Sequence, residues 1–267
     1  MDKPVSSLRR LGTFFGAVLA GVVVWVLVLL AAFRLDFALL ASPEQIPQPV
    51  VVTYTVGLYL WLMVLVVLMK RPMGSDAALN YGFAFNGRLL GFGWGLGLGG
   101  VLLLMGLELV TGIATFRMPD AWPLGILAGA VATAMAYAIS EELLFRGLFL
   151  RSLLLDHPPL RAMIISSVIF AALHFLRPNL GLGDIIPFLG LVVAGFVLAY
   201  AAWKTGSLWL PIGIHAGWVF FISVSDQLHL WEYLPQTLLL TGGRGPSSGL
   251  LGMVLLLGLL PLIKRHA

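Results

Sequence analysis

Three ionisable side chains interrupt an apolar stretch at residues 139–149, ISEELLFRGLF, which contains Glu141, Glu142 and Arg146. A bilayer disfavours such groups unless they have partners or a function. Glu142 and Arg146 are four residues apart, so on a helix they are expected to form an ion pair along one face. Glu141 is rotated by about 100° from Glu142. It therefore stands outside that pair and is a candidate functional carboxylate.

Two histidines also fall within apolar stretches, His174 in VIFAALHFL and His215 in LPIGIHAGW. A glutamate beside apolar walls can take a proton from water, and an imidazole can hold that water, donate to a leaving group or bind a metal. Glu141 and two histidines in a recessed, partly wet pocket therefore indicate water activation for amide hydrolysis. The zinc-protease motif H-E-x-x-H is absent. We leave open whether Glu141, His174 and His215 hold a divalent metal such as zinc or no metal.

The composition of the chain places these residues in a membrane protein. Of the 267 residues, 60% are hydrophobic and 10% are charged, and the mean hydropathy is +0.99. Soluble domains average about 25% charged residues. The apolar runs are long and do not alternate with polar residues, which predicts an all-α, polytopic integral membrane protein. We interpret the net charge of +4 as a sign of topology and expect no nucleic-acid partner.

About eight transmembrane helices are predicted, at 11–33, 48–69, 89–111, 122–155, 160–176, 185–203, 207–225 and 249–263. The first is too long for a signal peptide and is expected to be a retained anchor. With a cytoplasmic N-terminus, the basic residues of loops and tails lie inside, apart from Arg34, Arg117, Arg177 and Arg244. We therefore expect both termini in the cytoplasm. The expected location is a bacterial inner membrane, with the lipid bilayer as a partner.

The segment at 122–155 must bring the candidate residues to a common depth. As a helix it is about 50 Å long, more than the roughly 30 Å of hydrocarbon, so it should tilt or project into the cytoplasm. Glu141 and His174 lie 16 and 17 residues from His157 in the following turn, whereas His215 lies nine residues from the turn at Gly206. The distances along the helices from these turns are about 25 Å for Glu141 and His174 and about 14 Å for His215. The projection of the overlong segment into the cytoplasm offsets the difference of about 11 Å. All three groups are then expected at one depth, reached from the cytoplasmic side.

The glycine-rich stretch GFGWGLGLGG at 91–100 is interpreted as a surface for close helix packing. A phosphate-binding loop would need a strand before it and a helix after it.

The motifs resemble those of the CAAX-prenyl-endopeptidase and bacteriocin-processing family (CPBP) of intramembrane proteases, which includes abortive-infection-like proteins. Its first motif, E-E-x-x-x-R, is matched by Glu141, Glu142 and Arg146. Its second, F-x-x-x-H, is matched by Phe170 and His174. His215 matches the histidine of its third motif. The similarity covers roughly residues 120–225, with the active site in the fourth to seventh helices.

The resemblance implies a membrane endopeptidase acting on membrane-associated, peptide or prenylated protein substrates near the cytoplasmic face. Glu141 would be the general base, and His174 and His215 would coordinate or polarise the water. Glu142, Arg146 and Phe170 would support the site.

One position departs from the family pattern. Four residues after His215 the family commonly has Asn or Asp, which is thought to stabilise the oxyanion, but this chain has Val219. Loss of one such donor can reduce the rate by about 10²–10³. Ser166, Ser167 and Asn179 are the candidate replacements.

Val219 also motivates an alternative, a non-catalytic membrane immunity or scaffold protein with a degenerate site. A proton-coupled transporter is a third reading, since buried Glu and His form proton relays, but the paired interrupted helices of such transporters are not evident. We divide the chain into N-terminal transmembrane helices at 1–121, a CPBP-like catalytic core at 122–225, and an outside loop with the last helix at 226–267.

Overall fold

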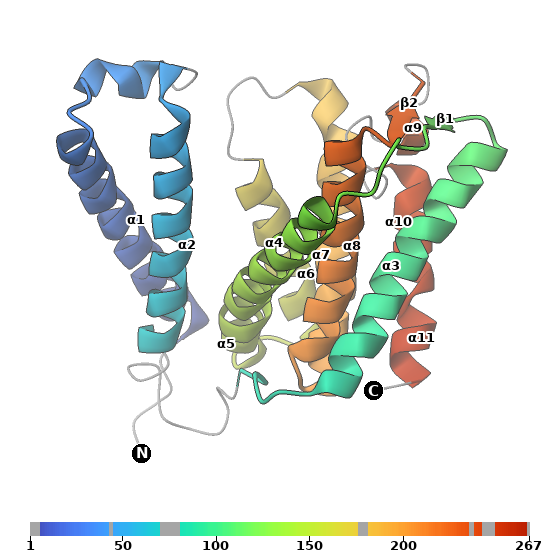
Figure 1. The fold of residues 1–267 in the computed structure, drawn as a ribbon. Coiled ribbons are helices and arrows are strands. Elements are labelled where there is room, and N and C mark those ends of the chain that lie inside the picture. Colours follow the sequence, from blue (N-terminus) through green and yellow to red (C-terminus); the bar gives the residue numbers. More distant parts are fainter. Residues whose placement is uncertain are drawn as a thin grey trace. The chain divides into compact units, whose positions relative to one another are not determined.

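The computed structural model describes residues 6–42, 45–69, 81–175, 181–234, 238–241 and 249–265, and these are mostly helical (Figure 1). The chain forms two compact units, Met1–Leu79 and Asn80–Ala267. The first two predicted helices lie in the first unit, and the third lies in the second unit.

The first unit is a helical hairpin of α1 (Ser7–Ala32) and α2 (Gln48–Met69), joined through the 3₁₀ turn η1 (Phe37–Ala41). Two tryptophans lock the hairpin by packing on glycines of the opposite helix. A side chain at Gly21 would collide with Trp61, and one at Gly57 would collide with Trp25. Small residues at these points therefore let the two helices approach closely.

The second unit contains the remaining elements in sequence order. They are α3 (Gly87–Val110), β1 (Ala114–Phe116), α4 (Leu124–Glu142), η4 (Leu143–Leu150), α5 (Arg151–Leu154), α6 (Pro159–His174), η5 (Leu182–Asp184), α7 (Ile185–Thr205), α8 (Trp209–Leu228), β2 (Trp231–Tyr233), α9 (Leu238–Thr241), α10 (Leu250–Gly258) and α11 (Leu260–Arg265).

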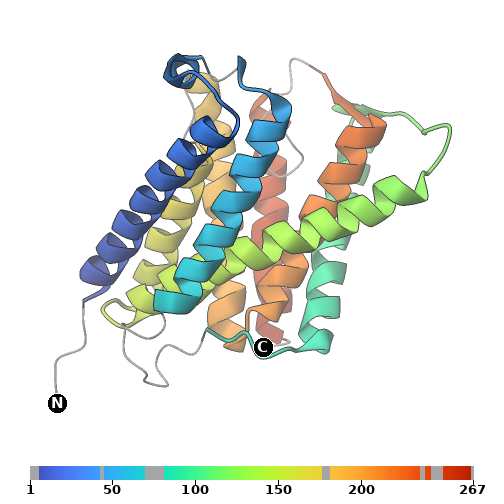
Figure 2. The same ribbon diagram turned by 60° about the vertical axis from the view of Figure 1, so that its left-hand side comes forward.

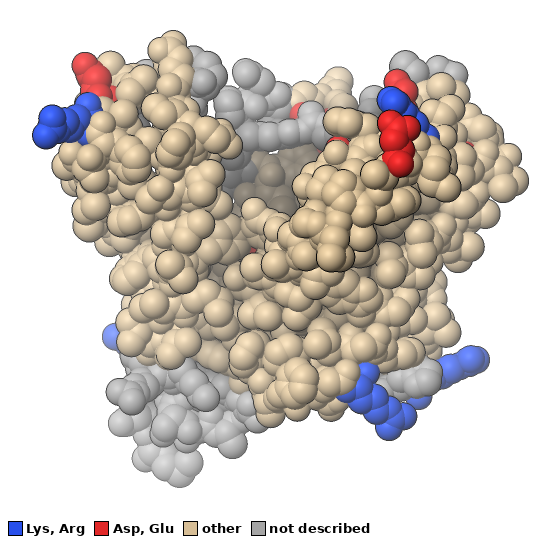
Figure 3. Space-filling view, in the orientation of Figure 1, with Lys and Arg blue, Asp and Glu red and all other residues tan. Residues whose placement is uncertain are grey.

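Helices occupy all eight predicted segments, but not all of them have the length and composition of a membrane span. Among the described residues, five helical stretches are long and apolar enough to cross a bilayer: Ser7–Ala32, Gln48–Leu68, Gly87–Val110, Leu124–Leu154 and Leu182–Thr205. The helix Pro159–His174 is apolar but shorter. On the face shown in Figure 3, most of the described charged side chains lie towards the helix ends. The count of eight crossings stays a prediction.

The fourth predicted segment forms a continuous run of α4, η4 and α5. Figure 2 shows α4 strongly inclined to α3, α7 and α8 of the second unit, and of these it packs on α8. Its length requires such a tilt. Its middle part, Leu143–Leu150, is a π-helix in which all eight residues are buried. Such π-helical turns are rare and are often found at functional sites.

Helices α3 and α8 pack backbone to backbone, which confirms the packing interpretation of the glycine-rich stretch. A Cβ atom at Gly93 or Gly97 would collide with the α8 backbone at Leu210 or Ile214. On α8, a Cβ at Gly213 would collide with the α3 backbone, and one at Gly217 would lie 2.7 Å from the nitrogen of Leu98. Position 215 lies between these two α8 glycines, so the seam sets the depth of its side chain.

Both ends of the α3–α8 pair are also tied together. Before α3, the carbonyl of Gly82 accepts a 2.8 Å hydrogen bond from the backbone of Leu208. Gly82 has a φ of 67°, and a side chain there would collide with the carbonyl of Gly206. At the far end, β1 and β2 pair antiparallel, with Thr115 opposite Glu232. This small sheet is an exception to the all-α expectation.

Candidate active site

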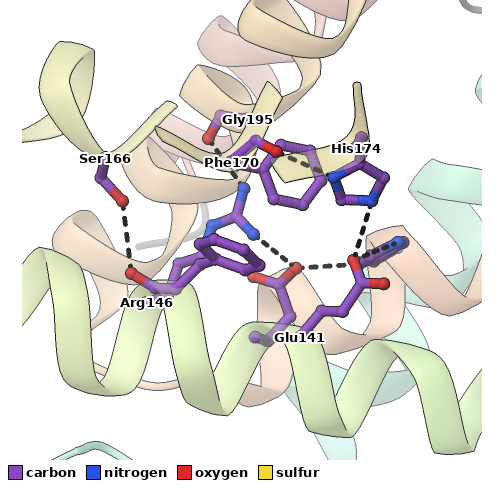
Figure 4. A network of polar contacts seen from close by, with 9 residues as sticks. Glu141, Arg146, Ser166, Phe170, His174 and Gly195 are labelled. Atoms are coloured by element: carbon purple, nitrogen blue, oxygen red, sulfur yellow. Dashed lines mark hydrogen bonds and ion pairs between the residues drawn. The ribbon is translucent and has the colours of Figure 1, made fainter. Parts of the chain in front are cut away.

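Three helical regions of the second unit supply the predicted site residues (Figure 4). The end of α4 and the start of η4 carry Glu141, Glu142 and Arg146. Helix α6 carries Phe170 and, in its last turn, His174. Helix α8 contributes His215.

The structure brings Glu141 together with both histidines. Its Oε2 atom lies 3.5 Å from Nε2 of His174 and 3.9 Å from Nε2 of His215. The Glu141 side chain is 14% exposed, that of His215 11% and that of His174 33%. The three polar groups therefore surround a common point that is recessed from the surface but not sealed, with His174 on its most open side.

A second carboxylate lies directly behind this centre. Oε1 of Glu142 accepts hydrogen bonds from Nη1 of Arg146 at 2.9 Å and from Nδ1 of His215 at 2.8 Å. The predicted pair of Glu142 and Arg146 is thus present, and both side chains are completely buried. The contact with His215 was not predicted, because it depends on how α4 is rotated against α8.

Arg146 connects the site to α7 as well. Its Nη2 atom donates to the carbonyl oxygen of Gly195 at 3.0 Å, and its Cζ lies 4.6 Å from the centre of the Phe170 ring. A Cβ at Gly195 would lie 3.1 Å from Ser167 and 3.2 Å from Phe170. The absence of a side chain therefore lets α7 approach closely enough for its carbonyl to meet the guanidinium. No signal in the sequence singled out Gly195.

His174 is oriented by its own helix. Its Nδ1 atom lies 2.8 Å from the carbonyl oxygen of Phe170, one turn earlier, and the two rings are 4.3 Å apart. The Phe170 ring in turn packs edge-on against Phe145 of η4, at 4.9 Å. The F-x-x-x-H spacing therefore places an aromatic ring between the histidine and the buried guanidinium.

The candidate replacements for the missing oxyanion donor are already engaged or cannot be placed. The hydroxyl of Ser166 donates to the carbonyl of Phe145 at 3.3 Å, and that of Ser167 donates to the carbonyl of Met163 at 2.6 Å. Both serines are buried, so neither hydroxyl proton is free to stabilise an oxyanion. Asn179 lies outside the described residues.

The donor types of Glu141, His174 and His215 are those of a His₂Glu zinc site. Within the described parts of the chain, however, no group of three or more His, Cys, Asp or Glu side chains is arranged to hold a metal ion. The three side chains as placed therefore do not form a metal site.

Fold and site together define a helical membrane protein with a buried carboxylate–dihistidine centre. Residues 121–221 match the family described as Type II CAAX prenyl endopeptidase Rce1-like. This region contains every residue of the site, and the match confirms the CPBP resemblance. The uncharacterized protein YyaK of Bacillus subtilis (strain 168) is 26% identical over 270 aligned residues, covering 91% of this chain and 87% of YyaK. No solved structure matches the chain.

The family match and the five apolar helices identify the chain as an integral membrane protein.

Proposed function

We propose that this chain is an intramembrane endopeptidase that cleaves membrane-associated or prenylated peptides near the cytoplasmic face. The observation that carries the proposal is the position of the Glu141 carboxylate, with Nε2 of His174 and of His215 within 4 Å of one oxygen. The match to the CAAX prenyl endopeptidase family supports a protease of this type.

In the proposed reaction, Glu141 takes one proton from a water molecule as the water oxygen bonds to the carbonyl carbon of the substrate. His174 and His215 hold and polarise that water through Nε2. The C–N bond then breaks, and the proton on Glu141 passes to the leaving nitrogen, which restores the carboxylate. Such general acid–base transfer contributes about 10²–10⁴ to the rate, and its efficiency depends on a fixed geometry of the three groups.

The test compares purified wild-type protein with the Glu141→Gln variant in liposomes, using a farnesylated peptide with a C-terminal CAAX sequence and its unprenylated counterpart. We expect wild type to release the C-terminal fragment and Glu141→Gln to lose cleavage by at least about 10²-fold. Mass spectrometry of the products identifies the cut.

Glu232→Gln is the matched control, since Glu232 is exposed on β2, away from the site. It should cleave like wild type. Undiminished cleavage by Glu141→Gln at normal protein level would exclude the proposed mechanism.

A second candidate, a non-catalytic immunity or scaffold protein, is favoured by Val219, which offers no hydrogen-bond donor where the family pattern has one. Complementation in a deletion strain separates the two functions. Full complementation by both Glu141→Gln and His174→Ala would support the scaffold, whereas loss in both would support the peptidase.

A further inference from the structure

The hydrogen bonds of the two imidazoles determine which ring nitrogen carries the proton. Nδ1 of His174 faces the carbonyl oxygen of Phe170, which can only accept. Nδ1 of His215 faces Oε1 of Glu142 at 2.8 Å. The same oxygen accepts from the Arg146 guanidinium, and an ionised carboxylate beside arginine is an acceptor only. Both rings must therefore donate through Nδ1.

This assignment leaves Nε2 of each ring directed towards Glu141. In a neutral imidazole with a proton on Nδ1, Nε2 is an acceptor. The contacts behind the rings, from Phe170 and Glu142, thus determine which atoms meet a water molecule in front of them. A ring with the opposite tautomer would instead present an N–H donor, which can bond only to the water oxygen and not to its hydrogens.

We propose, building on the proposed function, that Glu142 is a positioning residue: it holds His215 as the Nδ1–H tautomer with Nε2 turned towards Glu141. Glu142 does not touch the reacting atoms. It acts through His215, in the way that a carboxylate orients a catalytic or metal-bound histidine in other enzymes. Arg146, held by the Gly195 carbonyl, keeps Glu142 in place.

The tautomer can be measured without any substrate. Protein labelled with ¹⁵N-histidine is recorded in detergent micelles by long-range ¹H–¹⁵N correlation, which distinguishes protonated from unprotonated ring nitrogens. The His215→Gln variant assigns the His215 signals among the five histidines. We expect His215 to carry its proton on Nδ1. A proton on Nε2 of the neutral ring would overturn the proposal.

The double variant Glu142→Leu/Arg146→Leu removes the acceptor without leaving an unpaired buried charge. His215 should then shift to the Nε2–H form, whereas His174, held by a backbone carbonyl, should keep Nδ1–H and serves as the internal control. An unchanged His215 would refute a role for Glu142. If the double variant does not accumulate, the wild-type spectrum alone tests the proposal, through the position of the proton on His215.

The double variant Glu142→Leu/Arg146→Leu also supplies the kinetic arm of the test. We expect kcat to fall by about 10²–10⁴ with little change in KM, because the variant removes the acceptor that fixes the tautomer but does not touch the peptide. An unaltered kcat would contradict positioning. Failure of this proposal can be distinguished from failure of the proposed function. A wild-type protein that shows Nδ1–H at His215 but cleaves no peptide refutes the peptidase and leaves the tautomer assignment standing.

Discussion

At the scale of single residues, Glu142 uses one oxygen for two partners. Oε1 accepts from both Arg146 and His215, whereas the buried Oε2 has no hydrogen-bond partner among the described residues. The spacing of Glu142 and Arg146 is local and could be predicted from the sequence. The partner on α8 could not, since the rotation of one helix against another leaves no mark at a single position.

Val219 offers a gain-of-function experiment at the same scale. It lies one helical turn after His215 on α8, so an amide there would face the same side of the helix. We expect Val219→Asn to raise kcat by about 10²–10³, because it restores a donor to the oxyanion. The measurement is cleavage of the farnesylated peptide under single-turnover conditions.

Val219→Leu, which adds no donor, is the control and should leave kcat near the wild-type value. A rate for Val219→Asn equal to that of the leucine variant would mean that another group already stabilises the oxyanion. If neither variant nor wild type cleaves, the scaffold function gains support.

At the scale of elements, the seam between α3 and α8 was largely predictable. The small residues at 91–100 indicate close packing wherever they occur in a membrane helix, but the partner helix is revealed only by the structure. The π-helix of η4 was not predictable, because its sequence LLFRGLFL has the composition of an ordinary apolar helix. The β1–β2 pair likewise depends on contact between two three-residue segments far apart in the sequence.

The seam can be tested by adding single methyl groups. Gly97→Ala and Gly213→Ala place a Cβ against the backbone of the facing helix, so we expect each to lower the free energy of unfolding by about 1–3 kcal/mol. The midpoint of thermal unfolding in detergent, followed by circular dichroism, reports the change.

Gly95→Ala and Gly99→Ala are matched controls on the same helix, since nothing lies within 4 Å of a Cβ at either position. They should be neutral or stabilising by about 0.5–1 kcal/mol, because alanine favours the helix. Equal losses at all four positions would show that the cost does not come from contact between α3 and α8.

At the scale of the whole molecule, the direction of insertion into the membrane stays a prediction from the positions of the basic residues. The sequence contains no cysteine, so a single introduced cysteine can be labelled without background. We expect Arg117→Cys, at the β1 end of α3, to react with a membrane-impermeant maleimide in intact cells. Arg88→Cys, at the opposite end of α3, should react only after the membrane is permeabilised. Both positions are exposed.

Labelling of Arg88→Cys alone in intact cells would reverse the expected orientation. It would also move the opening of the site to the other side of the membrane.

The common depth of Glu141, His174 and His215 was predictable because helix rise and turn positions are regular. The network behind them was not, because Gly195 enters through its backbone alone and an apolar helix gives no sign of which carbonyl it presents.

The double fastening of α3 to α8, by the Gly82 carbonyl at one end and the paired strands at the other, has a mechanical consequence. Because α3 and α8 are held together at both ends, they are not expected to separate to admit a substrate. In the proposed peptidase, the substrate is therefore expected to approach from the α6 side, where His174 is the most open of the three groups. The rigid α8 wall would then hold His215 still, while α6 adjusts around the arriving chain.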